Sequence, residues 1–494
     1  MNLEATGQRV RASTPFLFFT GVAVFIFLAH APFWNLPYYW DELGQFVPAA
    51  LDIFQTGSWI PHSTVPNVHP PGVMAYLAGV WSIAGYSIAT TRLAMLVLAV
   101  AGAILTYVLA LRLGTNTGAA ALAVAFLTLS PLFFAQSMMA ELDMPAMLFT
   151  VLALVLFLDN RIVAAALASV ALVMLKETGL VASAIFGAFL CFEKRRRVAL
   201  WFLLPLVPLG LWLLALDRAT GHLFGNAAFT EYNVFYPLHP VRLGLALARR
   251  LYFLFAGTGH WIGALAAIYA WRRAKLFRTR AWRVAAWIFG LHVLLVSVLG
   301  GAVLERYLLP VLPFVYIAFA QALWTCPGPR RIASTLVLAA ALVIANFVNP
   351  PYPFPWENNL AFTDFVKLHA EAAHYLESYY PGKTVATMFP LSSAVRRPEF
   401  GYVSRPVRVR EVYDYRASNI APLARENVDI IALYSVTWDP WGLMDQPSWI
   451  GLLKRYYGYA APVKPDDLRA LLGVQPVARW QRHGQWVEIY RNSR

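Results

Sequence analysis

Long apolar runs are the feature that most limits how this chain can fold. Of its 494 residues, 59% are hydrophobic and only 13% are charged, whereas a soluble protein carries roughly a quarter charged residues. We therefore exclude a soluble globular protein and predict a mainly α-helical, polytopic membrane bundle of about 11 spans. The apolar runs occupy residues 14–34, 92–113, 118–139, 144–159, 162–175, 179–192, 198–216, 251–271, 282–303, 307–325 and 332–348. Several of them are shorter than the roughly 20 residues that a full crossing needs.

Basic residues select one orientation for this bundle. With the N-terminus inside, the cytoplasmic loops hold sixteen basic and three acidic residues, and the outer side of the membrane part holds seven basic and nine acidic residues. The positive-inside rule explains this asymmetry, so the net charge of +14 needs no nucleic-acid partner. Counting the apolar residues 71–87 as a span would place Lys194–Arg197 outside. We therefore expect 43–56 and 71–87 to be helices on the outer membrane surface.

The composition changes after residue 348. A proline-rich stretch, Asn349–Pro355, cannot continue a helix and predicts a stiff linker over 349–361. Beyond it, apolar residues recur at helical spacing from Phe362 to Leu376, and short strand-like runs follow at Thr384–Met388, Asp429–Tyr434 and Trp486–Tyr490. We predict a membrane domain over 1–348 and a small α/β domain outside the membrane over 362–494.

Charged residues at the predicted outer boundary are the candidates for chemistry. Asp41 and Glu42 follow three aromatic residues in the first outer loop, and that loop ends at His69-Pro70-Pro71. A carboxylate near apolar walls can act as a general base, although Asp41 could also simply cap the next helix. The remaining boundary residues are Arg92, Glu141, Asp143, Lys176, Glu177, Glu305 and Arg306. Helix capping, tight turns or ion pairs can account for several of these residues one at a time. Their shared position at one membrane boundary is what favours a functional site.

The order of these motifs resembles that of the GT-C membrane glycosyltransferases. The resemblance covers residues 14–348 and is nearest to the protein O-mannosyltransferases and to the lipid A aminoarabinose and galacturonic acid transferases. It rests on Asp41-Glu42, His69-Pro70-Pro71, Arg92-Leu93, Leu142-Asp143-Met144-Pro145, Lys176-Glu177-Thr178-Gly179 and Glu305-Arg306-Tyr307-Leu308-Leu309-Pro310.

The resemblance implies that a sugar passes, with inversion, from a polyprenyl-phosphate donor to a glycolipid, saccharide or protein acceptor. The reaction would take place at the outer face of the cytoplasmic membrane. Asp41 would deprotonate or position the acceptor, and Glu42 would support Asp41 or help to hold a divalent cation. The donor phosphate would meet His69, Lys176 and Arg306, with support from Arg92, Glu141, Asp143, Glu177 and Tyr307.

The cofactor question stays open at this point. Some lipid A transferases carry Glu-Lys-Pro-Pro where this chain has Val68-His69-Pro70-Pro71. Because this chain lacks that glutamate, a metal site cannot be carried over from those transferases, and we assign no metal ligand.

Two other classes of protein compete with the enzyme. A flippase or transporter of lipid-linked saccharides predicts inverted repeats and charges near the middle of the bilayer, and the sequence shows neither. A membrane scaffold that only presents an outer domain leaves the Asp41-Glu42 loop unexplained.

The predicted topology can be tested with reporter fusions. A fusion after Arg197 should report a cytoplasmic location, and a fusion after Arg494 should report the opposite side, because the charge asymmetry fixes both. A cytoplasmic signal at Arg494 would overturn the arrangement.

Overall fold

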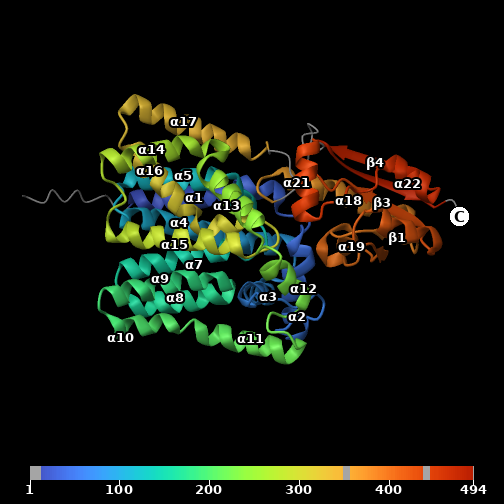
Figure 1. The fold of residues 1–494 in the computed structure, drawn as a ribbon, viewed down its shortest axis with the longest axis horizontal. Coiled ribbons are helices and arrows are strands. Elements are labelled where there is room, and N and C mark those ends of the chain that lie inside the picture. The colour runs from blue at the N-terminus through green and yellow to red at the C-terminus, as the bar shows by residue number, and fades with distance from the viewer. Residues whose placement is uncertain (1–12, 349–356, 438–445, 493–494) are drawn as a thin grey trace, which may run out of the picture.

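The computed structural model describes residues 13–348, 357–437 and 446–492. Long helices run side by side in one bundle, and a small sheet-containing domain sits at one end of it (Figure 1). This is the predicted helical membrane bundle with a C-terminal α/β domain. The proline-rich stretch 349–355 and the N-terminal residues Arg9 and Arg11 lie outside the described residues.

The predicted spans fall on helices, some of them broken. The bundle consists of α1 (Ser13–His30), α4 (Ile88–Arg112), α5 (Thr117–Leu129), α6 (Pro131–Ser137), α7 (Asp143–Leu158), α8 (Ile162–Leu175), α9 (Leu180–Phe192), α10 (Arg196–Ala199), α11 (Leu206–Thr220), α13 (Pro240–Phe255), α14 (His260–Arg273), α15 (Arg280–Val298), η7 (Glu305–Val311), α16 (Leu312–Trp324) and α17 (Gly328–Ala345).

Length and composition identify six of the described helices as membrane-spanning, or eight when each bent pair counts as one span. The bent pairs are α5 with α6, at 67°, and α13 with α14, at 42°. Pro131 begins α6 and has no N–H with which to continue the hydrogen bonds of α5, which accounts for the first bend. The helices α7, α8 and α9 are apolar but short. The chain is thus a multi-pass membrane protein, and the count of eleven spans stays a prediction.

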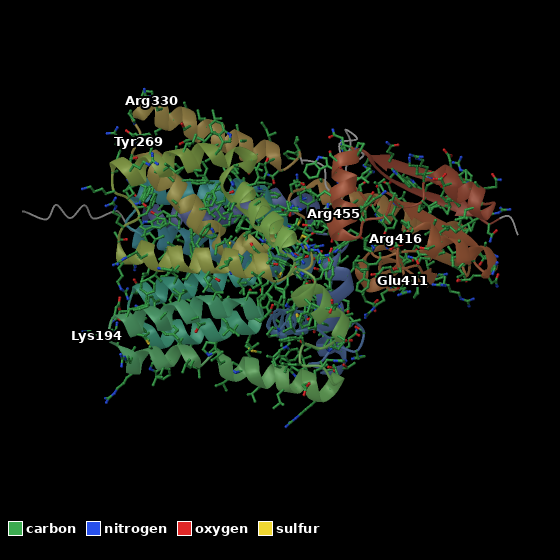
Figure 2. The ribbon with its side chains drawn as sticks, viewed as in Figure 1. Lys194, Tyr269, Arg330, Glu411, Arg416 and Arg455 are labelled. Carbon is green, nitrogen blue, oxygen red and sulfur yellow. The ribbon has the colours of Figure 1, made fainter. Side chains whose placement is uncertain are left out.

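Ion pairs at the far end of the bundle join the loops that were predicted to be cytoplasmic. Arg112 pairs with Asp159, and Arg280 pairs with Glu193. Figure 2 shows Lys194 and Arg330 at this same end, opposite the C-terminal domain. The predicted division of the loops between two ends of the bundle is therefore present in the fold.

Two helices of the loop between α1 and α4 lie across the end of the bundle nearest the C-terminal domain (Figure 1). A π-helical turn, η2 (Glu42–Phe46), runs into α2 (Val47–Thr56), and α3 (Gly72–Ala84) packs against α2. Figure 1 shows α3 nearly end-on, whereas the long helices run across the view. The structure has helices where the sequence predicted surface helices, and neither crosses the bundle.

The C-terminal domain has one five-stranded sheet. Its strands are β1 (Thr384–Thr387), β2 (Arg408–Glu411), β3 (Ile430–Tyr434), β4 (Gln475–Arg482) and β5 (Gln485–Arg491), in the order β2-β1-β3-β5-β4. β1 pairs in parallel with β2 and β3, and β5 pairs antiparallel with β3 and β4. The domain's helices are α18 (Ala361–Tyr379), α19 (Leu391–Ala394), α20 (Ala417–Ile420), α21 (Pro447–Tyr457) and α22 (Pro465–Leu472). α18 packs against β4 and β5.

This domain packs directly against the loop between α1 and α4. The Tyr39 ring lies 5.3 Å from the ring of Phe362 and 5.6 Å from that of Phe365. The Tyr402 hydroxyl donates to the Tyr38 carbonyl oxygen at 2.7 Å, and the Trp40 ring lies 5.3 Å from the Phe389 ring. The segment Tyr38–Trp40, which leads into Asp41, is therefore held between the bundle and the domain.

A buried ion pair anchors the same loop to the bundle. The guanidinium of Arg92 on α4 donates to both carboxylate oxygens of Glu42, and both side chains are at most 1% exposed. Arg92 also donates to the carbonyl oxygens of Leu36, Pro37 and Met138. Its charge is thus almost fully paired inside the protein, which is the condition under which a buried charge is tolerated.

Removing Arg92 should destabilise the protein strongly. Arg92→Ala leaves the Glu42 carboxylate buried without its cation, which costs about 3–5 kcal/mol in the free energy of unfolding. Denaturant titration of the detergent-purified protein measures this loss. The control is Arg112→Ala, which breaks an ion pair whose arginine is 45% exposed and should cost about 0–1 kcal/mol. Equal losses in the two variants would contradict the anchoring role.

Candidate functional site

The two neighbouring carboxylates of the first loop point in different directions. Glu42 faces inward: beyond Arg92, it accepts from the backbone N–H of Tyr39 at 2.9 Å and of Ala140 at 2.6 Å. Asp41 faces the other way and is 34% exposed. Trp40, just before it, has a φ of 46°, a left-handed conformation that few bulky residues adopt. Asp41 and Glu42 then follow with helical backbone angles, so their side chains point in different directions around the helix axis.

Helix capping does not explain Asp41. It stands at the N-cap position of η2, but its side chain accepts no capping hydrogen bond there. Instead its carboxylate accepts from the guanidinium of Arg306, which is 265 positions away in the sequence. Asp143 likewise makes no cap bond at the start of α7 and turns to Lys176 and Arg306.

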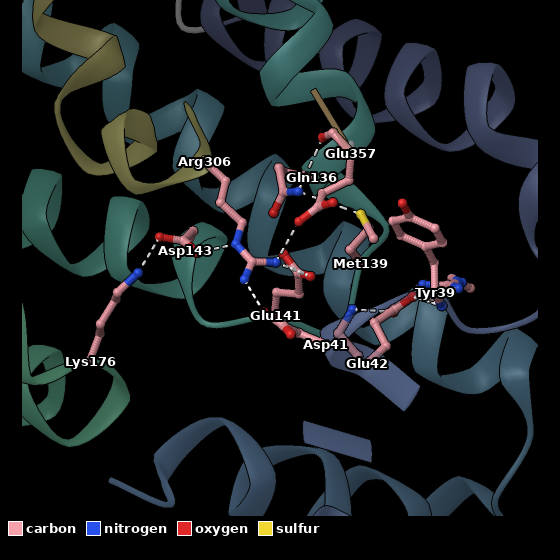
Figure 3. Close-up of polar contacts among 12 residues, drawn as sticks. Tyr39, Asp41, Glu42, Gln136, Met139, Glu141, Asp143, Lys176, Arg306 and Glu357 are labelled. Atoms are coloured by element: carbon pink, nitrogen blue, oxygen red, sulfur yellow. Dashed lines mark hydrogen bonds and ion pairs between the residues drawn. The ribbon is translucent and has the colours of Figure 1, made fainter. Parts of the chain in front are cut away.

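Arg306 is the centre of the site. It belongs to η7, is 3% exposed, and contacts four carboxylates from three separate parts of the chain (Figure 3). Its Nη1 donates to Glu141 and, at 2.6 Å, to Glu357, while its Nη2 donates to Asp41. Its Nε lies 3.6 Å from an oxygen of Asp143. Of these four carboxylates, only that of Asp41 is more than 3% exposed.

A second cation extends this cluster. Lys176 is buried at the end of α8, where its Nζ donates to Asp143 and lies 4.4 Å from the centre of the Tyr307 ring. Asp143 therefore joins Lys176 to Arg306, as Figure 3 shows. His69 makes a separate contact, with its Nδ1 2.9 Å from a carboxylate oxygen of Glu177. The predicted donor-phosphate residues thus lie within one connected region of the structure.

A large cavity of about 1520 Å³ opens beside this cluster, between the bundle and the C-terminal domain. Asp41, His69, Lys176 and Arg306 all line it, whereas Glu42, Arg92 and Glu141 are not among its lining residues. Most of its remaining wall is apolar or aromatic and comes from α12 (Ala227–Thr230), η5 (Glu231–Phe235), α13 and the residues that end and follow α15. This wall includes Phe229, Tyr232, Leu245, Tyr252, Phe253 and Leu299. The cavity can therefore take a molecule that has both a charged group and an apolar chain.

The structure adds two residues that the sequence motifs did not reveal. Glu357 follows the proline-rich stretch, within the predicted linker, and only its position directly after those prolines could have drawn attention to it. Arg249 lies on the polar side of α13, lines the cavity and pairs with Glu305. Four of the five described residues of the predicted linker are buried: Glu357, Asn358, Asn359 and Ala361.

Burial changes the proton affinity of the cluster. It raises the pKa of Glu357 to about 7, where the Asp41 carboxylate adds to the rise and Arg306 opposes it. Burial also raises the pKa of Glu141, again against the pull of Arg306. Two carboxylates on one guanidinium nitrogen repel each other, so this pair holds a proton more tightly than exposed glutamates do. Asp41 is the more accessible proton acceptor.

The described part of the chain contains no group of three or more His, Cys, Asp or Glu side chains that could hold a metal ion. The carboxylates around Arg306 are instead oriented toward a cation that the protein itself provides. The oxygens of Glu42 face Arg92 and backbone amides, so they are not directed at a site for a bound cation. Support of the loop that carries Asp41 is the role that the geometry favours.

Comparison with known proteins places the whole chain in a structural class. No family model matches the sequence, and no curated protein matches it. Among solved structures, ArnT from Cupriavidus metallidurans bound to undecaprenyl phosphate is similar, with a TM-score of 0.58 and 14% identity over 97% of this chain and 98% of that one.

A second similar structure is an oligosaccharyltransferase from Archaeoglobus fulgidus in its apo form. Its TM-score is 0.50, with 12% identity over 98% of this chain and 75% of that one. At such identities the likeness concerns the fold, and both neighbours are GT-C fold glycosyltransferases. The chain described here therefore has the GT-C fold, as its motifs predicted.

Proposed function

We propose that the protein is an inverting glycosyltransferase that moves a sugar from a polyprenyl-phosphate donor to an acceptor hydroxyl or amine. The acceptor is a glycolipid, a saccharide or a protein at the outer face of the cytoplasmic membrane. The N-terminus then lies in the cytoplasm, and the C-terminal domain lies outside. The GT-C fold and a neighbour bound to undecaprenyl phosphate support this proposal.

The observation that carries the proposal is the placement of Asp41. It is the exposed member of an otherwise buried charge cluster, and it lines the same cavity as Lys176 and His69. The apolar wall of α13 and α15 continues from this polar corner. A lipid phosphate fits such a cavity with its tail along the apolar wall and its phosphate near Lys176.

Transfer in this arrangement needs one displacement. The acceptor oxygen or nitrogen attacks the anomeric carbon while the bond from that carbon to the phosphate oxygen breaks, and the bonding pair leaves with the phosphate. The acceptor proton passes to Asp41 as general base. Attack opposite the leaving group inverts the anomeric configuration.

Arg306 and Lys176 have different roles in this mechanism. Because the charge of Arg306 is shared among four carboxylates, we assign to Arg306 the main role of holding Asp41 in place. Contact with the donor phosphate is its secondary role. Lys176 has one carboxylate partner, Asp143, and borders the cavity. We therefore assign to Lys176, with His69, the main stabilisation of the departing lipid phosphate.

Asp41→Asn should abolish most of the transfer. The amide keeps the shape but cannot accept the proton, and loss of a general base costs about 10²–10⁴-fold in rate. The measurement is transfer from an undecaprenyl-phosphate-linked sugar by purified protein in detergent. Asp159→Asn, at the other end of the bundle, is the control and should retain activity. Full transfer by Asp41→Asn would refute the mechanism. If wild-type protein in sealed proteoliposomes moves the lipid-linked sugar across the membrane but transfers no sugar, a flippase is favoured.

Lys176→Met should weaken the departure of the phosphate. Methionine keeps the length of the side chain without its charge, so the developing phosphate charge loses a cation, which costs about 10²–10³-fold in kcat. Steady-state kinetics with the same donor measure it. Lys194→Met, which changes an exposed lysine at the opposite end, should leave kcat unchanged. An unchanged kcat in Lys176→Met would remove Lys176 from the leaving-group role.

A further inference from the structure

The short segment Glu357–Asn359 ties the start of the C-terminal domain into the end of the bundle. Asn358 Nδ2 donates to a carboxylate oxygen of Glu305 at 2.8 Å. Asn359 Nδ2 donates to the Ala345 carbonyl oxygen at 2.9 Å, and its Oδ1 accepts from the Ala361 N–H. Each of the two asparagines thus fixes the segment independently of the first residue, Glu357.

Glu357 itself uses its carboxylate for Arg306. Its Oε1 lies 2.6 Å from Nη1, the nitrogen that also donates to Glu141. A guanidinium Nη carries two hydrogens, so these two glutamates occupy both hydrogens of Nη1. The neighbouring Nη2 is then directed at Asp41. A planar guanidinium held at Nη1 by two carboxylates cannot turn away from Asp41 without breaking both bonds.

Glu357 cannot act on a substrate directly. Its side chain is 3% exposed, and it is not among the residues that line the cavity. The mechanism proposed above, which needs Asp41, Lys176 and His69, also leaves it without a chemical step. Its carboxylate instead faces Arg306, the buried cation that also donates to Asp41.

We propose that Glu357 is a positioning residue, which holds Arg306 so that Asp41 stays oriented toward the acceptor. This inference rests on the proposed transferase function and extends it. The segment that leads into the C-terminal domain then completes the site, so the domain and the bundle share one functional centre. The carboxylate of Glu357 fixes the guanidinium by accepting from Nη1.

The positioning role can be tested by replacing the Glu357 side chain alone. The Glu357 carbonyl oxygen accepts from Gln136 Nε2 at 3.3 Å, and Asn358 and Asn359 keep their own anchors. Replacing the Glu357 side chain therefore leaves the backbone tied in place. Glu357→Gln keeps an acceptor oxygen for Arg306 and removes the charge, whereas Glu357→Ala removes both.

The expected result is a graded loss of kcat. Glu357→Gln should lower the kcat for transfer from an undecaprenyl-phosphate-linked sugar about tenfold, and Glu357→Ala should lower it further. The dissociation constant for undecaprenyl phosphate should stay within about twofold of wild type, because Glu357 does not reach the cavity. A purely structural role would instead lower the amount of folded protein and leave the kcat of the folded fraction unchanged.

A matched control and a double variant separate the remaining outcomes. Glu488 on β5 is also a buried glutamate between two arginines, Arg469 and Arg479, with no contact to the Arg306 cluster. Glu488→Gln should keep the wild-type kcat. In the Asp41→Asn background, Glu357→Gln should cause little additional loss, because both changes act on the same group.

Three results would overturn the positioning role: a wild-type kcat in both Glu357 variants, an equal loss in Glu488→Gln, or a full additional loss in the Asp41→Asn background. Failure of the proposed function gives a different result, because the wild-type protein itself would then transfer no sugar from the undecaprenyl-phosphate donor.

Discussion

The guanidinium of Arg306 is the charge on which the end of the bundle next to the C-terminal domain depends. It is buried among carboxylates from the first loop, the α6–α7 turn, the start of α7 and the segment after α17. A buried ion is tolerated only when its partners are in place. Segments more than 260 positions apart in the sequence must therefore meet at this point for the fold to be stable.

The same constraint separates structural from functional carboxylates. Glu42 and Glu141 are buried and matched to arginines, while Asp41 keeps one side toward the cavity. Only a group with both a fixed partner and access to solvent can be held still and still exchange a proton with a substrate. The large cavity beside it supplies an apolar wall in addition, which suits a donor with a lipid tail.

Much of this could be predicted from the sequence, because each signal was local. Apolar runs and the sidedness of basic residues predicted the bundle and its two ends. The helical spacing from Phe362 to Leu376 predicted α18, whose core-facing residues are buried as expected. The motifs pointed to Asp41, Lys176 and Arg306, which line the cavity, because charges that interrupt apolar sequence are costly. The same reasoning also selected Glu42, Arg92 and Glu141, which do not line it.

Other features depend on contacts between distant parts of the chain, and no local sequence pattern predicts them. The strands β2 and β4 are mostly polar, because they form the edges of the sheet. The contrast between Asp41 and Glu42 follows from their distant partners, Arg306 and Arg92, which two adjacent acidic residues in a sequence cannot reveal. Glu357 looked like a residue of a linker, because its partner Arg306 belongs to a distant element.

The most direct test of the account is a structure of the protein with undecaprenyl phosphate bound. The account predicts the phosphate within hydrogen-bonding distance of Lys176 Nζ and close to His69, with the lipid tail along α13 and α15 and Asp41 facing the open side of the cavity. A phosphate bound at the opposite end of the bundle, near Lys194 and Arg280, would contradict it.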